Sequence, residues 1–270
     1  MPRVSDSERP FDEIRGVVLD LDGTVYRGDG VLPGAAEAVA ALRDRGIAVC
    51  FCSNNPTKTP AEYVDRLAGM GIEADESAIL PASTVTRDYL RDHHADDPTY
   101  LLGSDSLGEY LRASGQRLVD DPRDASVFVA SWDERFDYGD MRDALAGVDE
   151  ETTFLGTDPD RTIPTAEGLV PGSGAVIGAV ARTVGREPDR VLGKPSPEAA
   201  EDALARLGVP AENCLVVGDR LDTDLRMGAD HGMTTALVLT GVSTRADAAE
   251  SAVDPDAVLD SLADLPALLD

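Results

Sequence analysis

Short apolar runs alternate with helical patterns near both ends of this chain. An apolar run that stops at a turn signal is typical of a buried strand, whereas apolar residues three and four apart are typical of a helix. The clearest strand patterns are 16–19, 47–52, 214–217 and 235–239, and the clearest helical patterns are 35–45, 60–68 and 197–207. Thr59 and Glu62 flank Pro60 in a capping-box pattern, which predicts a helix start at Pro60. This alternation predicts an α/β fold, with a parallel sheet covered on both faces.

The middle of the chain differs from its ends. It holds more loop residues and most of the aromatic residues. Its strand patterns are 99–102, 127–131 and 153–156, and a helical pattern follows at 174–184. We interpret residues 82–188 as a second α/β domain inserted into the first. Residues 1–81 and 189–270 then form one split core domain.

Two carboxylates follow the first predicted strand. Asp20 and Asp22 are one residue apart, and Gly23 and Thr24 come next. In an open α/β sheet, ligands bind just beyond the carboxyl ends of the strands. Carboxylates this close repel each other unless a cation, a proton or hydrogen-bond donors compensate. A solvated acidic turn is the plainer interpretation, so the other motifs decide.

Three further polar motifs lie beside other predicted elements. They are Ser53-Asn54-Asn55 after the strand at 47–52, Gly193-Lys194-Pro195-Ser196-Pro197 at the start of the helix at 197–207, and Asp219-Arg220-Leu221-Asp222-Thr223-Asp224, which follows Gly218 after the strand at 214–217. Because the carboxyl ends of parallel strands meet at one edge of a sheet, we expect these motifs to meet Asp20 and Asp22 there.

With four motifs in this order, the chain resembles the haloacid dehalogenase (HAD) superfamily. Within it, the chain is most similar to the phosphatases of subclass IIA, the NagD- and 4-nitrophenylphosphatase-like group, also at segments 156–160 and 168–174. The resemblance implies a Rossmann-like parallel-sheet core with an inserted α/β cap of the C2 type. It also implies a phosphatase that acts on a small phosphorylated metabolite, such as a sugar phosphate, a phosphoglycolate-like ester or a nucleotide. Asp158 departs from the group, which commonly has asparagine there, and adds negative charge near a loop expected to face the substrate.

Asp20 and Asp22 suit different steps of phosphoryl transfer. A carboxylate can attack phosphorus directly and form an aspartyl-phosphate, which splits one hard step into two. Asp20, at the strand end, is the expected nucleophile. Asp22 is the expected general acid and base, which protonates the leaving oxygen and later deprotonates the attacking water. The resemblance implies the same assignment.

Magnesium is the expected cofactor, because Mg²⁺ takes hard oxygen ligands and bridges carboxylates to phosphate. The candidate ligands are Asp20, the backbone carbonyl of Asp22, and Asp219. Asp224 is either a further ligand or a group that holds metal-bound waters. Its position equally fits a carboxylate in the first turn of the next helix. Asp222 is expected to be solvated.

Ser53, Asn54 and Lys194 are the expected phosphate contacts. Ser53 and Asn54 supply a hydroxyl and an amide, although a serine after a strand more often caps a turn. Lys194 supplies a compact cation that can neutralise the nucleophile and the phosphate. It is one of only two lysines, and Lys58, the other, fits a solvated loop charge better than a phosphate contact.

Two alternatives to a hydrolase stay open at this point. A phosphotransferase or mutase would pass the phosphoryl group from Asp20 to an alcohol instead of water. A non-catalytic regulatory protein on the same fold is disfavoured because Asp20, Asp22, Lys194 and Asp219 are all present.

The three histidines lack metal-ligand spacing, and the three cysteines fall in apolar runs that indicate reduced, buried side chains.

The charge balance limits the partners. The chain carries 51 Asp and Glu against 24 Lys and Arg, a net charge of −27. Such a surface repels nucleic acids and anionic membranes, so we expect neither as a partner. A diffusely acidic, lysine-poor chain predicts a halophilic protein, because concentrated counterions screen its self-repulsion.

The sequence also indicates where the protein works. No apolar run approaches ~18 residues, and the polar residues 1–10 lack the order of a secretory signal. We therefore expect a cytoplasmic enzyme. The resemblance adds a homodimer formed through the cap.

Overall fold

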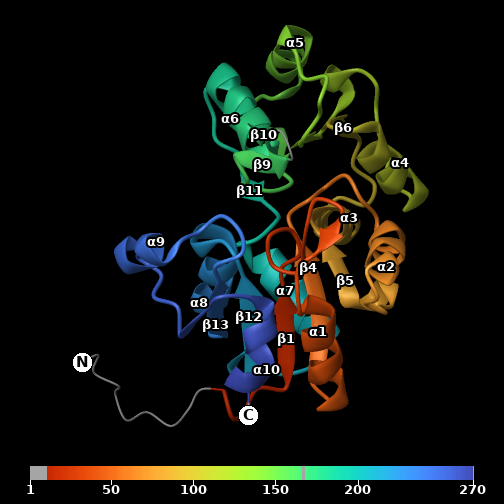
Figure 1. Ribbon diagram of the computed structural model, residues 1–270. Helices are drawn as coiled ribbons and strands as arrows, with labels where there is room; N and C mark the ends of the chain where they lie inside the picture. Colours follow the sequence, from red (N-terminus) through yellow and green to blue (C-terminus); the bar gives the residue numbers. More distant parts are fainter. Residues whose placement is uncertain (1–10, 166–167, 270) are drawn as a thin grey trace. The chain divides into compact units, whose positions relative to one another are not determined.

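The computed structural model describes residues 11–165 and 168–269 (Figure 1). The described chain divides into two compact units. One consists of Cys52–Leu67 and Ala74–Asp202, and the remaining described residues form the other. The expectation about a secretory signal in residues 1–10 lies outside the described residues. Among the residues described, no helix is long and apolar enough to cross a bilayer.

The larger sheet confirms the predicted α/β class with a central parallel sheet. Its strand order is β14-β13-β12-β1-β4-β5. The strands are β1 (Gly16–Leu19), β4 (Ala48–Ser53), β5 (Ile79–Pro81), β12 (Cys214–Gly218), β13 (Thr234–Val238) and β14 (Ala257–Leu259). From β14 to β4 every neighbouring pair is parallel. All residues of β1 and β12 are buried, as expected for central strands covered on both faces.

Short helices accompany this sheet. They are α1 (Ala35–Asp44), α7 (Pro197–Leu207), α8 (Arg226–Asp230), α9 (Arg245–Glu250) and α10 (Leu265–Leu268). Helix α1 contacts α10, while α8 packs on β12 and β13. A two-stranded ribbon, β2 (Tyr26–Arg27) with β3 (Gly30–Val31), follows β1. The helix predicted at 197–207 is observed with the same first and last residues. The other strands and helices predicted for the core begin and end within one residue of the observed ones.

The unit that contains Ala74–Asp202 has its own parallel sheet. Its order is β11-β8-β7-β6, formed by β6 (Thr99–Leu102), β7 (Val127–Ala130), β8 (Thr153–Gly156) and β11 (Arg190–Val191). An antiparallel hairpin, β9 (Thr162–Thr165) and β10 (Gly168–Pro171), contacts α6 (Ser173–Val184). The other helices are α2 (Pro60–Gly69), α3 (Ala82–His93), α4 (Asp105–Ala113) and α5 (Tyr138–Gly147). The predicted cap, 82–188, lies wholly within this unit, and its boundaries stay a prediction.

Aromatic packing and capping explain local parts of this unit. Phe128 lies between Tyr100 and Phe154, with ring centroids 5.3 and 6.0 Å away. At the start of α2, Glu62 accepts hydrogen bonds from the Thr59 backbone and hydroxyl, and the Thr59 hydroxyl accepts one from the Glu62 N–H. The predicted capping box is therefore confirmed.

Short turns complete the described chain. The 3₁₀ segments are Glu76–Ala78, Pro122–Asp124, Ala211–Asn213 and Leu262–Asp264, and a single π-helical turn spans Leu221–Leu225.

Candidate active site

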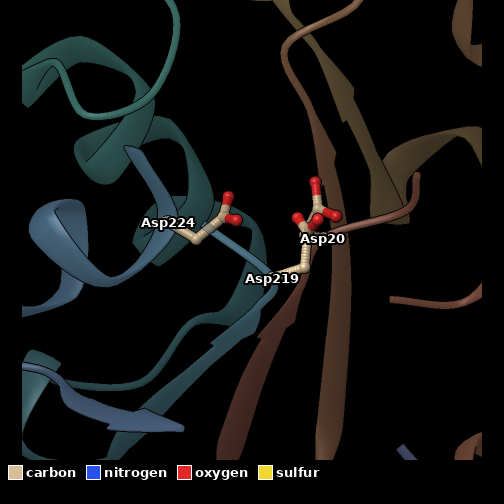
Figure 2. A group of neighbouring side chains, drawn as sticks. All are labelled: Asp20, Asp219 and Asp224. Atoms are coloured by element: carbon tan, nitrogen blue, oxygen red, sulfur yellow. The ribbon is translucent and has the colours of Figure 1, made fainter. Parts of the chain in front are cut away.

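Three carboxylates gather at the carboxyl ends of β1 and β12. Asp20 directly follows β1 and Asp219 directly follows β12, while Asp224 lies in the π-helical turn after it. The two strands pair in parallel with Leu19 opposite Val217, so both end at one edge of the sheet. One oxygen from each carboxylate lies within 4.8 Å of the others. Figure 2 shows the Asp20 and Asp219 carboxylates close together, with that of Asp224 turned toward them.

Each of these carboxylates is positioned by a nearby donor. The Thr24 hydroxyl donates to Asp20 Oδ2 at 3.0 Å. The backbone N–H of Val242 donates to Asp219 Oδ2 at 2.7 Å. The backbone N–H of Arg220 donates to Asp224 Oδ2 at 3.1 Å. Asp20 and Asp224 are therefore held by donors of their own loops, and Asp219 by a donor from the loop after β13.

Gly23 explains why a glycine follows the two aspartates. Its φ is +96°, in the left-handed region that favours glycine. A Cβ at this position would also lie 2.6 Å from Asp219 Oδ2. Gly23 therefore permits both the turn after β1 and the close approach of Asp219.

The acidic group fits a divalent cation. Its three side chains are 8%, 2% and 1% exposed, so water screens their mutual repulsion poorly. Three hard oxygen donors from two strand ends are the kind of ligand set that Mg²⁺ takes. Among the described residues, no histidine or cysteine joins this group. Asp224 is buried with Asp20 and Asp219, whereas Asp222 is exposed, as predicted.

Asp22 has different surroundings. Its side chain is exposed, and its Oδ2 accepts a hydrogen bond from the buried Tyr26 hydroxyl at 3.1 Å. The side chain of Asp22 is not part of the buried acidic group. The two aspartates of the first motif are therefore not equivalent.

A second cluster, in the other unit, brings together the second and third motifs. Lys194 is 2% exposed, and its Nζ donates to the Cys52 carbonyl at the end of β4 at 2.9 Å. The Asn54 side chain donates in turn to the Lys194 carbonyl at 3.0 Å. Ser53 is buried, with its hydroxyl 3.1 Å from that of Tyr63. Lys194 and Asn54 are thus tied to each other across 140 residues of sequence.

The loop after β8 joins this cluster, although no motif of the core indicated a contact between them. Asn54 Nδ2 also donates to Asp160 Oδ1 at 3.2 Å. Asp158 accepts hydrogen bonds from the Thr157 hydroxyl at 3.1 Å and from the Asp160 N–H at 3.2 Å. A Cβ on Gly193 would lie 2.8 Å from both Asn54 Oδ1 and Asp158 Cβ. Only the likeness of segment 156–160 to the family pointed to this loop.

The Asp158 carboxyl, which was expected to add negative charge to its loop, is buried. Its side chain is 2% exposed. Burial, followed by the charge of the neighbouring Asp160, raises the pKa of the Asp158 carboxyl well above its ordinary value. The raised pKa extends the pH range in which the protonated, neutral form is present. The sequence pattern identified the substitution but not its burial.

The remaining candidates have structural surroundings. His94 Nδ1 lies 2.9 Å from Asp97, and His231 Nδ1 lies 2.9 Å from the Met227 carbonyl. Cys50 and Cys52 are buried in β4, as predicted. Ser173 begins α6 as expected for the glycine-rich segment 172–174.

Comparisons with known proteins agree with this fold. A haloacid dehalogenase-like hydrolase family model matches residues 17–117, and a HAD-hydrolase-like model matches residues 191–265. Sugar-phosphatase AraL of Bacillus subtilis is 34% identical over 253 residues, 94% of this chain and 92% of that protein.

Solved structures of related proteins have the same fold. A p-nitrophenyl phosphatase from Archaeoglobus fulgidus is 33% identical with a TM-score of 0.88, over 94% of this chain and 98% of the other. NagD from Escherichia coli K-12 is 28% identical with a TM-score of 0.83, over 93% of this chain and 97% of the other. The chain belongs to the haloacid dehalogenase-like hydrolase family. Within that family, it is a phosphatase of the NagD-like branch, subclass IIA.

Proposed function

We propose that this phosphatase is a magnesium-dependent phosphomonoester hydrolase that works through an aspartyl-phosphate on Asp20. The observation that carries the proposal is the buried group of Asp20, Asp219 and Asp224 at the ends of two parallel strands. Phosphoryl transfer requires positioning and charge neutralisation more than any other help from a protein. A nucleophilic carboxylate beside a cation site supplies both.

In the first step, an oxygen of Asp20 attacks phosphorus while the bond from phosphorus to the ester oxygen breaks. Asp22 gives its proton to that leaving oxygen. In the second step, Asp22 takes a proton from water as the water attacks phosphorus, which releases inorganic phosphate and restores Asp20. Asp20 is buried and held by the Thr24 hydroxyl, whereas Asp22 is exposed and held by the Tyr26 hydroxyl, so the two carboxylates have different surroundings, which supports different roles for them.

Asp20, Asp219 and the carbonyl of Asp22 would hold the magnesium ion. Asp224 would either bind the ion directly or hold its waters. When bound, Mg²⁺ supplies positive charge that offsets the charges of the carboxylates and the phosphate.

Lys194, Ser53 and Asn54 would bind phosphoryl oxygens. The Lys194 ammonium is fixed by the Cys52 carbonyl, and Asn54 is fixed by the Lys194 carbonyl and Asp160. A cation and donors that are already ordered lose little entropy when the substrate binds.

The proposed substrate is a small phosphorylated metabolite. Two of the related proteins are named as a sugar phosphatase and a p-nitrophenyl phosphatase, which supports a small ester. A sugar phosphate, a phosphoglycolate-like ester or a nucleotide would each satisfy the core chemistry. The proposed setting is the cytoplasm of a salt-accumulating cell, without nucleic-acid or membrane partners, which the net charge of −27 supports. A homodimer formed through the cap, residues 82–188, is part of the same proposal.

The direct test is Asp20→Asn with p-nitrophenyl phosphate. We expect kcat to fall by about 10³-fold or more, because the nucleophile is lost. Asp222→Asn, which removes an exposed carboxylate nearby, is expected to keep its activity. Equal release of inorganic phosphate with and without an added alcohol would support hydrolysis over transfer. Substantial turnover by a folded Asp20→Asn protein would contradict the assignment.

A further inference from the structure

The loop between β13 and α9 contacts every segment that supplies a carboxylate to the buried acidic group. Its residues 240–243 belong to the same compact unit as Asp20, Asp219 and Asp224. None of the four sequence motifs includes these residues. The loop therefore lies beside the proposed cation site without being part of any motif that predicted it.

Asp219 is held by two consecutive residues of this loop. The N–H of Val242 donates to Asp219 Oδ2 at 2.7 Å, and the N–H of Ser243 donates to the Asp219 carbonyl at 3.0 Å. One bond holds the side chain of Asp219 and the other holds its backbone. The loop thus fixes the direction of this carboxylate.

Gly241 makes this close approach possible. A Cβ on Gly241 would lie 1.8 Å from Asp219 Oδ2 and 2.4 Å from Asp219 Cβ, so rotation of the carboxylate alone could not relieve the contact. On the other side, a Cβ on Gly23 would lie 2.6 Å from the same oxygen and 3.1 Å from Gly241 Cα. The Asp219 carboxylate therefore lies against two glycines. A side chain at position 241 would displace it.

Thr240 holds the turn of the first motif. Its hydroxyl donates to the Gly23 carbonyl at 2.6 Å. The Arg27 guanidinium, from the ribbon that follows this turn, donates to the Thr240 carbonyl. Thr240 therefore connects the loop to the segment that carries Asp20 and Asp22 through two hydrogen bonds.

Ser243 holds the third segment. Its hydroxyl accepts a hydrogen bond from the N–H of Leu221 at 3.3 Å, and Leu221 begins the π-helical turn that carries Asp224. Buried carboxylates repel one another when no cation is bound, which drives them apart. Hydrogen bonds from all three segments to one loop oppose that movement.

We propose that residues 240–243 are a positioning loop, which holds Asp219 and the turn after β1 in the arrangement that binds Mg²⁺ before the ion arrives. The inference rests on the proposed function, because Mg²⁺ is the proposed ligand of this group. Residues 240–243 act through Asp219 and Gly23 and are not ligands themselves. Loss of a group that orients a metal ligand typically weakens metal binding by about 10- to 100-fold.

Calorimetric titration of the folded, full-length proteins with magnesium chloride tests this proposal. A background of about 1 M potassium chloride screens the diffuse attraction of Mg²⁺ to the acidic surface. Asp219→Asn gives the heat that remains without the site. We expect Gly241→Ala to weaken Mg²⁺ binding by about tenfold or more. Gly178→Ala is the matched control and should bind Mg²⁺ like the wild type, because a Cβ on this exposed glycine of α6 would meet no atom within 4 Å.

Thr240→Val is a milder variant that keeps the branched shape and loses only the hydroxyl. Loss of this one hydrogen bond should weaken Mg²⁺ binding by about fivefold, and Thr240→Ser should restore the affinity. Thr183→Val is the matched control. The Thr183 hydroxyl is also half-buried and donates to a backbone carbonyl, that of Ala179, at 2.8 Å within α6.

Melting temperatures with and without Mg²⁺ separate positioning from general support of the fold. The increase in melting temperature that Mg²⁺ causes should shrink in Gly241→Ala and in Thr240→Val. An equal loss of stability with and without Mg²⁺, together with a wild-type Kd, would overturn the proposal. If Gly241→Ala does not fold, Thr240→Val decides.

The same titrations distinguish this inference from the proposed function. A wild type that binds no Mg²⁺ would refute the proposed metal site, and the role of the loop with it. A wild type that binds Mg²⁺, with equal affinity in the folded loop variants, would refute the role of the loop alone.

Discussion

The buried hydroxyl of Tyr26 donates a hydrogen bond to Asp22 Oδ2 at 3.1 Å. Tyr26 begins the short ribbon that follows the Asp20 and Asp22 motif, so the ribbon anchors the second carboxylate. This contact directs the Asp22 side chain, which the structure leaves outside the buried group of Asp20, Asp219 and Asp224.

Tyr26→Phe tests the positioning of Asp22. The variant keeps the buried ring but loses the hydroxyl, so Asp22 should sample more orientations. We expect kcat to fall about tenfold, which is less than the full contribution of a general acid because Asp22 itself is retained. KM should change far less. Tyr138→Phe, at a 73% exposed tyrosine, is the control. An unchanged kcat for an alkyl phosphate substrate would show that Tyr26 does not position the acid.

Removal of the metal should affect both activity and stability. Without a cation the buried carboxylates repel one another, so added Mg²⁺ should raise the melting temperature of the wild type. A ligand at 100 times its Kd adds about 2.7 kcal/mol to the free energy of unfolding. In Asp219→Asn this increase in melting temperature should largely disappear. Because the variant has one buried negative charge fewer, it should melt at a higher temperature than the wild type when both are free of metal. Calorimetry with a chelator and with Mg²⁺ measures both effects.

Asp222→Asn is the control for this experiment, because its carboxylate is exposed and near Asp219 in sequence. Full activity of the wild type in excess chelator would contradict a metal requirement.

Asp158 should make the stability depend on pH. Its pKa is raised in the folded protein by burial and by Asp160, so the folded state binds this proton more tightly than the unfolded state. The stability that it contributes is fully present below the unfolded pKa, about 3.9, and is lost as the pH rises through the raised folded pKa.

Asp158→Asn removes this titration. The free energy of unfolding of the wild type should fall relative to that of the variant as the pH rises from about 5 to about 8. Urea unfolding at several pH values measures the difference. Parallel pH profiles for the two proteins would mean that Asp158 is ionised throughout that range.

Salt should stabilise the folded protein strongly. The net charge of −27 produces self-repulsion, and the screening length shrinks from about 10 Å at 0.1 M salt to about 3 Å at 1 M. We expect the melting temperature to rise by several degrees over a potassium chloride series. Sucrose at matched osmolality should raise it less. A melting temperature that ignores potassium chloride would exclude the halophilic interpretation.

Much of the core could be predicted because its signals are local. The apolar run at β1 and the helical pattern of α7 lie in single short windows, and their bounds match the structure. The shortest strands, such as β11 with two residues, carry too few residues to show a period and were not predicted.

The site was only partly predictable for a different reason. The motif residues follow strand ends, and a parallel sheet brings strand ends together, so the grouping of Asp20 with Asp219 follows from topology. The bond from Asn54 to Asp160 joins residues 106 positions apart and depends on how a loop folds back. Burial of Asp158 has the same origin, and a sequence pattern does not encode it.

The most direct test of the central claim is a rapid-mixing experiment with Asp22→Asn and p-nitrophenyl phosphate. Nitrophenolate leaves without help from an acid, whereas the water that attacks the aspartyl-phosphate needs Asp22 as its base. We predict a burst of one nitrophenolate per protein chain, followed by slow turnover. Mass spectrometry of the acid-quenched protein should then find one phosphoryl group on Asp20. A burst without phosphoryl on Asp20, or no burst from a protein that still turns over, would contradict the account.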